Sequence, residues 1–159
     1  MDPYETNSSK IPSTDLYADV PLYGRYTPQQ DDFKPESIEY WEPVLSLCTK
    51  KNRIYPADEG GRDVFASGSV IVKSGHLVND LEAGEKETDY FYADRNEIEA
   101  IRLARGVLGR MGVRVPCVYF AGRVKDYRVL IQERLPGVVL SIAKPYLTTA
   151  QRESFKEQA

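Results

Sequence analysis

The sequence predicts an α+β domain in which one long helix covers a five-stranded antiparallel sheet. Two patterns predict this fold. Five short runs rich in Val, Ile, Tyr and Phe are separated by turn-forming residues, as is typical of consecutive antiparallel strands. Between the third and the fourth run, apolar residues recur at helical spacing from about residue 94 to residue 111.

The five runs fall at regular places along the chain. Glycine-containing turns separate the first three, because glycine permits positive φ at little cost. The strands are expected at residues 53–56, 63–66, 69–73, 117–121 and 127–133, with turns at 58–62, 67–68 and 122–126.

The long helix has a clear expected start. Asp94 is predicted to be its N-cap, and Glu97, three positions later, would complete a capping box. The helix is expected to end at Gly109 or Gly112.

A shorter helical segment is expected at residues 36–50. Pro43 suits the first turn of a helix that runs to about Lys50 better than a helix middle. Trp41 is expected to be a packing residue. Residues 1–35, with five prolines and no regular period, are expected to be a disordered lead-in. Their tyrosines would either pack locally on the domain or mark a docking segment.

The composition is that of an ordinary globular protein of one domain. Of the 159 residues, 42% are hydrophobic and 28% are charged, which excludes wholesale disorder and fibrous classes. No apolar run reaches about 18 residues, so no membrane span is expected. The start lacks a secretion signal, and Cys48 and Cys117 form neither a disulfide framework nor a metal motif. We therefore expect a cytoplasmic protein.

Charge is distributed unevenly along the chain. Residues 80–99 carry a net charge of −6 and residues 100–159 a net charge of +7, against −3 for the whole chain. The overall charge argues against nucleic-acid binding. The basic part forms either solvated faces or a surface that attracts a phosphate-bearing ligand.

Lys73 and Glu97 are the first candidate site residues. A lysine at the end of an apolar strand can neutralise phosphate oxygens, and a carboxylate in the first turn of a covering helix can hold its direction. Alone, Lys73 could be a solubilising strand-end residue and Glu97 a capping residue. Together they match the strand–helix pair with which kinases align the α- and β-phosphates of ATP.

Two backbone segments are weaker candidates. The strand that ends at Gln132 and Glu133 leaves the sheet near Leu135, before a Pro-Gly pair, and its exposed backbone could bind an adenine ring. Gly60 and Gly61 could let backbone N–H groups approach phosphates. A plain strand end and a plain hairpin turn are the alternatives.

Four strings resemble, in order, motifs of the fungal aminoglycoside-phosphotransferase-like kinases. The string FASGSVIVKSGHL resembles their third-strand region, and NEIEAIRLA matches their helix motif Asn-Glu-Ala-x-x-(Met/Leu)-Arg. VRVPCVYFAG and VLIQERLPG resemble their fourth strand and hinge. The resemblance covers about residues 50–159 and implies a protein-kinase-like N-lobe at 36–135, followed at 136–159 by the hinge and a truncated start of the C-lobe.

The resemblance also implies roles at the phosphate end of a nucleotide site. Lys73 would contact the ATP phosphates, and Glu97 would be its ion-pair partner. Glu99, two positions on, would face elsewhere on the helix and is the weaker substitute. The loop at Gly60 and Gly61 would cover the phosphates.

At the adenine end, the resemblance places Gln132 at the gatekeeper position. The carbonyl of Glu133 and the N–H of Leu135 would meet the adenine ring.

The departure from the family pattern concerns catalysis. The family's C-lobe carries a His-x-Asp loop, a downstream Asn and a metal-binding Asp, whereas the only histidine here is His76, beside the third strand. Thr148 and Gln151 match a capping box that opens a helix at the end of the chain. We therefore expect weak or vestigial ATP binding, Mg²⁺ binding only with a C-lobe, and no activity of this chain alone. Full-length relatives would phosphorylate a small-molecule hydroxyl, or a protein.

A second hypothesis is a non-catalytic interaction or scaffold module. An isolated N-lobe exposes the sheet face that a second lobe would cover. Self-association or a protein partner could bury that face.

Overall fold

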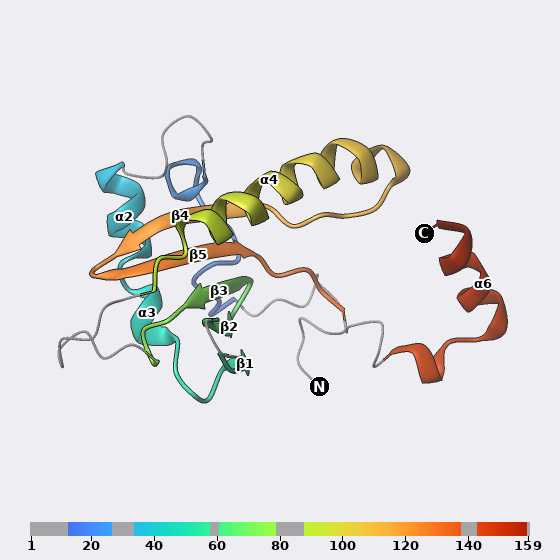
Figure 1. Cartoon of the computed structure of the whole chain (residues 1–159), viewed down its shortest axis with the longest axis horizontal. Coiled ribbons are helices and arrows are strands. Elements are labelled where there is room, and N and C mark those ends of the chain that lie inside the picture. Colours follow the sequence, from blue (N-terminus) through green and yellow to red (C-terminus); the bar gives the residue numbers. More distant parts are fainter. Residues whose placement is uncertain (1–12, 27–33, 58–60, 79–87, 138–142, 159) are drawn as a thin grey trace.

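The strands form a single antiparallel sheet in the order β1-β2-β3-β5-β4 (Figure 1). The computed structural model describes residues 13–26, 34–57, 61–78, 88–137 and 143–158. The strands are β1 (Arg53–Tyr55), β2 (Asp63–Ser67), β3 (Val70–Ser74), β4 (Val118–Val124) and β5 (Tyr127–Glu133). The helices are η2 (Leu22–Gly24), α2 (Pro35–Trp41), α3 (Val44–Leu47), α4 (Phe91–Leu108), η3 (Gly109–Met111), η4 (Lys144–Tyr146) and α6 (Thr149–Gln158). The expected α+β architecture with five antiparallel strands and one long helix is confirmed.

Strand register separates the sheet into two faces. Val72 pairs with Phe65 on one side and Ile131 on the other, whereas Lys73 pairs with Val64 and Leu130. Because successive side chains point to opposite faces, these two sets lie on opposite sides of the sheet. We call the first the core face and the second the α4 face. The core face carries Phe65, Val72, Phe120 and Ile131, and the α4 face carries Val64, Ala66, Ile71, Lys73, Leu130 and Gln132.

The hydrophobic core lies against the core face and is closed by α2, α3 and the segment before them. Trp41 and Val44 are completely buried there, together with Phe65 and Ile131. The packing role expected for Trp41 is confirmed. Its ring packs edge-on against Tyr40, with centroids 4.8 Å apart.

Residues 13–26 are ordered against this core through Tyr17 and Val20, so the expected disorder is wrong for that segment. Tyr17 is 5% exposed and Val20 2% exposed. Tyr17 stacks on Trp41 with ring centroids 5.1 Å apart, and the Trp41 indole Nε1–H donates to the carbonyl of Gly24 at 2.9 Å. Burial of these rings compensates the ordering entropy that a proline-rich segment must lose.

The rest of the expected lead-in lies partly outside the described residues, at 1–12 and 27–33. Of the described tyrosines of the lead-in, Tyr17 is buried in the domain, whereas Tyr23 is 55% exposed and meets the ring of Tyr40 edge-on, with centroids 5.6 Å apart. Local packing, one of the two roles considered for these tyrosines, therefore holds for Tyr17.

The helical segment before the sheet is broken at its proline. The first helix, α2, ends at Trp41, and Pro43 is the N-cap of α3, which ends at Leu47 rather than near Lys50. The helix ends early because Cys48 is extended and the side chain of Asn52 accepts a hydrogen bond from the Thr49 N–H at 2.8 Å. That contact supplies an alternative to helical hydrogen bonding.

The long helix starts earlier than expected, and Asp94 is not its N-cap. Helix α4 begins at Phe91, whose N–H donates to the side chain of Asp89 at 2.9 Å. Asp94 lies inside the first turns and is fully buried. The end agrees with expectation, since a 3-10 turn follows Leu108 and Gly112 adopts a left-handed φ of 75°.

Strand β4 is longer than expected and runs to Val124 through Gly122. The turn is confined to Lys125 and Asp126, with Lys125 at a φ of 54°. At the end of the chain, the capping box is confirmed: the Thr148 N–H donates to Gln151 Oε1 at 2.9 Å, and the Gln151 N–H donates to Thr148 Oγ1 at 3.3 Å. Figure 1 shows α6 standing apart from the sheet.

Within the described ranges, no helix combines the length and the apolar character needed to span a bilayer.

Candidate functional site

Lys73 and Glu97 form an ion pair between the sheet and the long helix. The Nζ atom of Lys73 lies 2.5 Å from Oε1 of Glu97, and their side chains are 23% and 29% exposed. Glu97 therefore pairs with a lysine of the sheet and does not close a capping box with Asp94. The two residues expected to act together are adjacent, although 24 positions separate them in sequence.

Strand alternation and helix packing create this pair. Lys73 is the second-to-last residue of β3. The alternation of side chains along the strand directs it to the α4 face, away from the buried Val72 and Ser74. Glu97 lies in the second turn of α4, which runs alongside the sheet (Figure 1). A partly buried position strengthens the ion pair relative to one in open solvent.

A second group of charges lies one helical turn from Glu97. The buried carboxylate of Asp94 accepts hydrogen bonds from Arg62, just before β2, and from Arg128 on β5, where Nε lies 2.9 Å from Oδ2. Among the described residues, the buried Nη1 atom of Arg62 has no hydrogen-bond partner. Within that part of the chain, this Nη1 atom is a donor that an anion could accept from.

The glycine loop is described only in part. Gly60 lies outside the described residues. Gly61 lies just before Arg62, and its carbonyl accepts a hydrogen bond from the Tyr90 hydroxyl at 2.7 Å. The side of the loop that enters β2 is thus tied to the start of α4.

Gln132 lies on the same face of the sheet as Lys73, near the C-terminal end of the neighbouring strand β5. It pairs with Ile71, two residues before Lys73, so the Gln132 and Lys73 side chains are one strand and two residues apart. Within the described part of the chain, its buried Oε1 atom has no hydrogen-bond partner. A ligand donor placed against this oxygen would satisfy it.

The backbone after Gln132 is held on both sides. The N–H of Glu133 donates to the carbonyl of Cys117 at 2.7 Å, and the N–H of Arg134 donates to the carbonyl of Ser69 at 2.9 Å. Leu135, the next residue, is half-buried and outside any strand. The segment therefore leaves the sheet from a fixed position, and its role as a hinge stays a prediction.

His76 has a packing role. Its Nε2 atom lies 2.8 Å from the carbonyl oxygen of Cys48, and its Nδ1 atom lies 3.1 Å from Oγ of Ser74. Its ring packs near Phe65, with centroids 5.2 Å apart. Both ring nitrogens are occupied, so this histidine is placed to fix the loop after β3.

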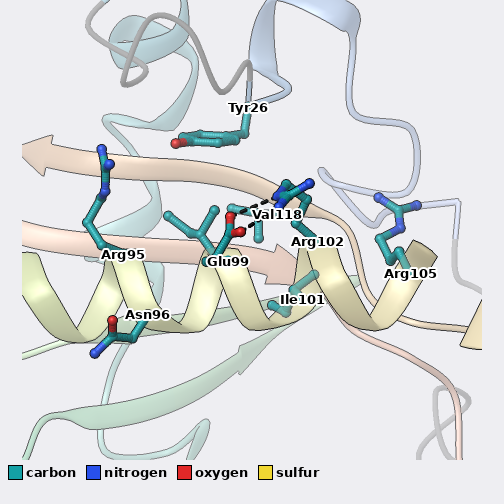
Figure 2. Close-up of a pocket in the computed structure, with 9 residues that line it drawn as sticks. Tyr26, Arg95, Asn96, Glu99, Ile101, Arg102, Arg105 and Val118 are labelled. Carbon is teal, nitrogen blue, oxygen red and sulfur yellow. Dashed lines mark hydrogen bonds and ion pairs between the residues drawn. The ribbon is translucent and has the colours of Figure 1, made fainter. Parts of the chain in front are cut away.

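A groove runs along α4, and neither Lys73 nor Glu97 is among the residues that line it (Figure 2). Its volume is about 690 Å³, and we call it the arginine groove. Its lining consists of Tyr26, Arg95, Asn96, Ile98, Glu99, Ile101, Arg102, Arg105 and Val118. Three arginines and one glutamate make its lining net positive, in a chain whose net charge is −3.

Glu99 belongs to this groove and not to the Lys73 site. It accepts a hydrogen bond from Nε of Arg102 at 2.8 Å, which is drawn in Figure 2. The Arg102 hydrogen bonds lower the pKa of the Glu99 carboxyl. Its outward direction supports Glu97 as the partner of Lys73.

Sequence reasoning did not identify the Arg62–Asp94–Arg128 group. Arg62 and Arg128 each stand two residues before a member of the α4 face, Val64 and Leu130, so strand alternation indicates the face of the two arginines but not their partner. The spacing of Asp94 and Glu97, however, matches a capping box, which accounts for Asp94 without any partner in the sheet. Among the described residues, no group of three or more His, Cys, Asp or Glu side chains is placed to hold a metal ion.

No family model, curated protein or solved structure matches this chain.

Proposed function

We propose that the α4 face binds a nucleotide, with Lys73 contacting its phosphates and Glu97 holding the lysine in place. The observation that carries this proposal is the 2.5 Å contact between Lys73 Nζ and Glu97 Oε1. A strand lysine paired with a helix glutamate is the arrangement that protein kinases need in place for ATP phosphates. The proposal therefore assigns this chain to the kinase-like N-lobes that its four motifs resemble.

The charges around the pair support an anionic ligand. Lys73, Arg62 and Arg128 supply three positive charges, and Asp94 and Glu97 supply two negative ones. The cluster is therefore net positive before a ligand binds. Phosphate oxygens would neutralise the excess and could accept from the Arg62 Nη1 atom, which has no partner among the described residues.

The other end of the α4 face suits a flat, partly apolar group. Ala66 and Ile71 are half-buried there, next to the unsatisfied Gln132 Oε1 atom. An adenine ring could cover these side chains while its polar edge meets the backbone of Glu133 and Leu135. ATP is therefore the proposed ligand, with weak affinity in this chain alone.

Phosphoryl transfer is not part of the proposal for the 159-residue chain. Transfer needs a group that positions the acceptor and acidic ligands for Mg²⁺. The only histidine, His76, is committed to Cys48 and Ser74, and the family's His-x-Asp loop is not in the sequence. In a protein with a second lobe, the expected acceptor is a small-molecule hydroxyl.

Thermal unfolding with and without ATP tests the binding proposal. For a dissociation constant of about 1 mM, 10 mM ATP would stabilise the chain by about 1.4 kcal/mol. That corresponds to an increase in melting temperature of about 3–6 °C for a domain of this size. Lys73→Ala should remove the increase, whereas Lys125→Ala, at the β4–β5 turn, should retain it. An equal increase in both variants would contradict the proposed role of Lys73.

The arginine groove favours a second candidate function, an interaction module for an acidic peptide segment. Its floor is formed by the half-buried Ile98, Ile101 and Val118, and Arg95 and Arg105 line it as exposed residues. Arginine beside an apolar patch is common at protein interfaces. Carboxylates of a partner would complement the positive rim while one aliphatic side chain fills the floor.

A labelled peptide of Glu and Leu, compared with its Gln and Leu counterpart, tests this second function by fluorescence anisotropy. Only the acidic peptide should bind, and charge reversal at Arg95 and Arg105 should abolish binding. Arg110→Glu is the matched control, because Arg110 lies on the same helical segment but outside the groove. Equal binding of both peptides would refute the proposal. Sedimentation of the free protein shows whether a second copy is the occupant instead.

A further inference from the structure

The only fully buried residue of α4 is an aspartate. Of the helix from Phe91 to Leu108, only Asp94 is buried. The apolar residues that face the sheet, such as Ile98 and Ile101, are half-exposed. Most helices are held to a sheet by a buried apolar stripe, so the position of α4 depends unusually strongly on its polar contacts.

Asp94 makes those contacts with two different strands. Its Oδ1 atom accepts from Arg62, at the entry to β2, and its Oδ2 atom accepts from Arg128 on β5. The side chains of Asp94, Arg62 and Arg128 are 0%, 7% and 14% exposed. We call these three residues the Asp94 clamp.

Aromatic rings at the start of α4 support the clamp. The Arg62 guanidinium lies 4.9 Å from the centroid of the Tyr90 ring, and the Arg128 guanidinium lies 4.9 Å from that of Phe91. Each arginine therefore combines a charged hydrogen bond with a cation–π contact. The first turn of α4 is fixed in both direction and rotation.

The clamp and the Lys73–Glu97 pair lie on the same side of the helix. Residues three apart on a helix are neighbours, with about 5–6 Å between their Cβ atoms. A rotation or shift that frees Asp94 from its arginines would therefore also move Glu97 relative to Lys73.

We propose that Asp94 is a positioning residue, which acts through α4 to hold Glu97 against Lys73. The expected effect on ligand binding rests on the proposed nucleotide function, because a displaced Glu97 would no longer hold the Lys73 side chain toward the phosphates. The geometry of the pair itself is independent of any ligand and can be measured without one.

Asp94→Asn is the main test, because it removes the charge and keeps the size of the side chain. The side-chain resonances of Lys73, recorded by NMR without nucleotide, should move toward those of the Glu97→Gln variant. The dissociation constant for ATP should rise at least fivefold in Asp94→Asn. The Asp94→Asn/Glu97→Gln double variant should be no weaker than Glu97→Gln alone, because both changes break the same pair.

Three controls separate positioning from general loss of structure. Fluorescence of Trp41, which lies on the core face, should be unchanged in Asp94→Asn. Glu99→Gln, on the outer side of α4, should leave the Lys73 resonances as they are. If Asp94→Asn does not fold, Arg128→Lys weakens the clamp while retaining its charge. The Lys73 resonances of that variant should then move toward those of Glu97→Gln.

Unchanged Lys73 resonances in a folded Asp94→Asn protein would overturn the inference. A double variant whose dissociation constant for ATP rises by the product of the two single-variant increases would also overturn it. Failure of the wild-type protein to bind ATP would instead refute the proposed function, while the resonances of Lys73 still decide the role of Asp94.

Discussion

Nζ of Lys73 lies 2.5 Å from Oε1 of Glu97, and this contact joins the middle strand of the sheet to the long helix α4. With 23% and 29% of their side chains exposed, the two residues remain accessible to a ligand. The contact therefore contributes little to stability, since ion pairs of this exposure contribute about 1 kcal/mol or less.

Removal of the glutamate should affect nucleotide binding more than folding. In Glu97→Gln, Lys73 loses the charge that directs it, and we expect about a tenfold weaker affinity for ATP, or about 1.4 kcal/mol. Urea unfolding should change by about 1 kcal/mol or less. Isothermal titration with ATP measures the first quantity. Glu99→Gln is the matched control, and an equal loss of affinity in both variants would contradict the assignment.

Trp41→Phe should destabilise the domain by about 1–3 kcal/mol. The change deletes the indole donor to Gly24 and leaves that carbonyl without its 2.9 Å partner. Urea unfolding followed by circular dichroism is suitable, because Trp41 is the only tryptophan. Tyr92→Phe, at a side chain that is 76% exposed, should have almost no effect. A loss below about 0.5 kcal/mol in Trp41→Phe would argue against ordered packing of residues 13–26.

Stability should decrease as the pH rises above about 10, partly through Tyr17. Burial raises the pKa of Tyr17 from 10.0 to about 12, with further contributions from Tyr40, Cys48 and Asp15. Between these two values the unfolded chain loses this proton while the folded chain keeps it. The unfolded state then binds fewer protons, so the free energy of unfolding falls with increasing pH.

Tyr17→Phe isolates this effect. Between pH 9.5 and pH 11.5, the free energy of unfolding should decrease less in the variant than in the wild-type protein. Parallel decreases in the two proteins would mean that Tyr17 is not buried in solution.

The two cysteines should differ in reactivity toward a thiol reagent at pH 8. Cys48 is 1% exposed, and burial raises the pKa of its thiol to about 12. Cys117 is half-buried and therefore more accessible. The folded protein should expose one reactive thiol and the denatured protein two. Cys117→Ser should remove the fast reaction, and a fast reaction that persists in this variant would contradict the burial of Cys48.

The sheet and the long helix could be predicted because their signals are local and periodic. The apolar run before Lys73 and the spacing around Ile98 and Ile101 each identify an element without knowledge of its neighbours. The pairing of Lys73 with Glu97 was predicted from a strand-end lysine that needs a carboxylate to direct it, an argument from chemistry that adds a long-range relation to the local periodicity.

The Asp94 clamp could not be predicted in the same way. Asp94 followed by Glu97 satisfies a local capping rule, and nothing local indicates that Arg62 and Arg128, 32 and 34 positions away, would compete for the carboxylate. Two charge-assisted hydrogen bonds in a buried place outweigh one exposed cap. The packing of residues 13–26 was missed for a similar reason, since the ring of Tyr17 finds Trp41 only in the folded chain.

Mapping of ATP binding by two-dimensional ¹H–¹⁵N NMR tests the central claim most directly. The proposed site predicts that backbone resonances of Lys73, Glu97, Gln132 and Leu135 shift on titration with ATP to 10 mM, and that the shifts disappear in Lys73→Ala. The arginine groove should be unaffected. Shifts confined to the groove, or none at 10 mM ATP, would contradict the assignment of the α4 face as a nucleotide site.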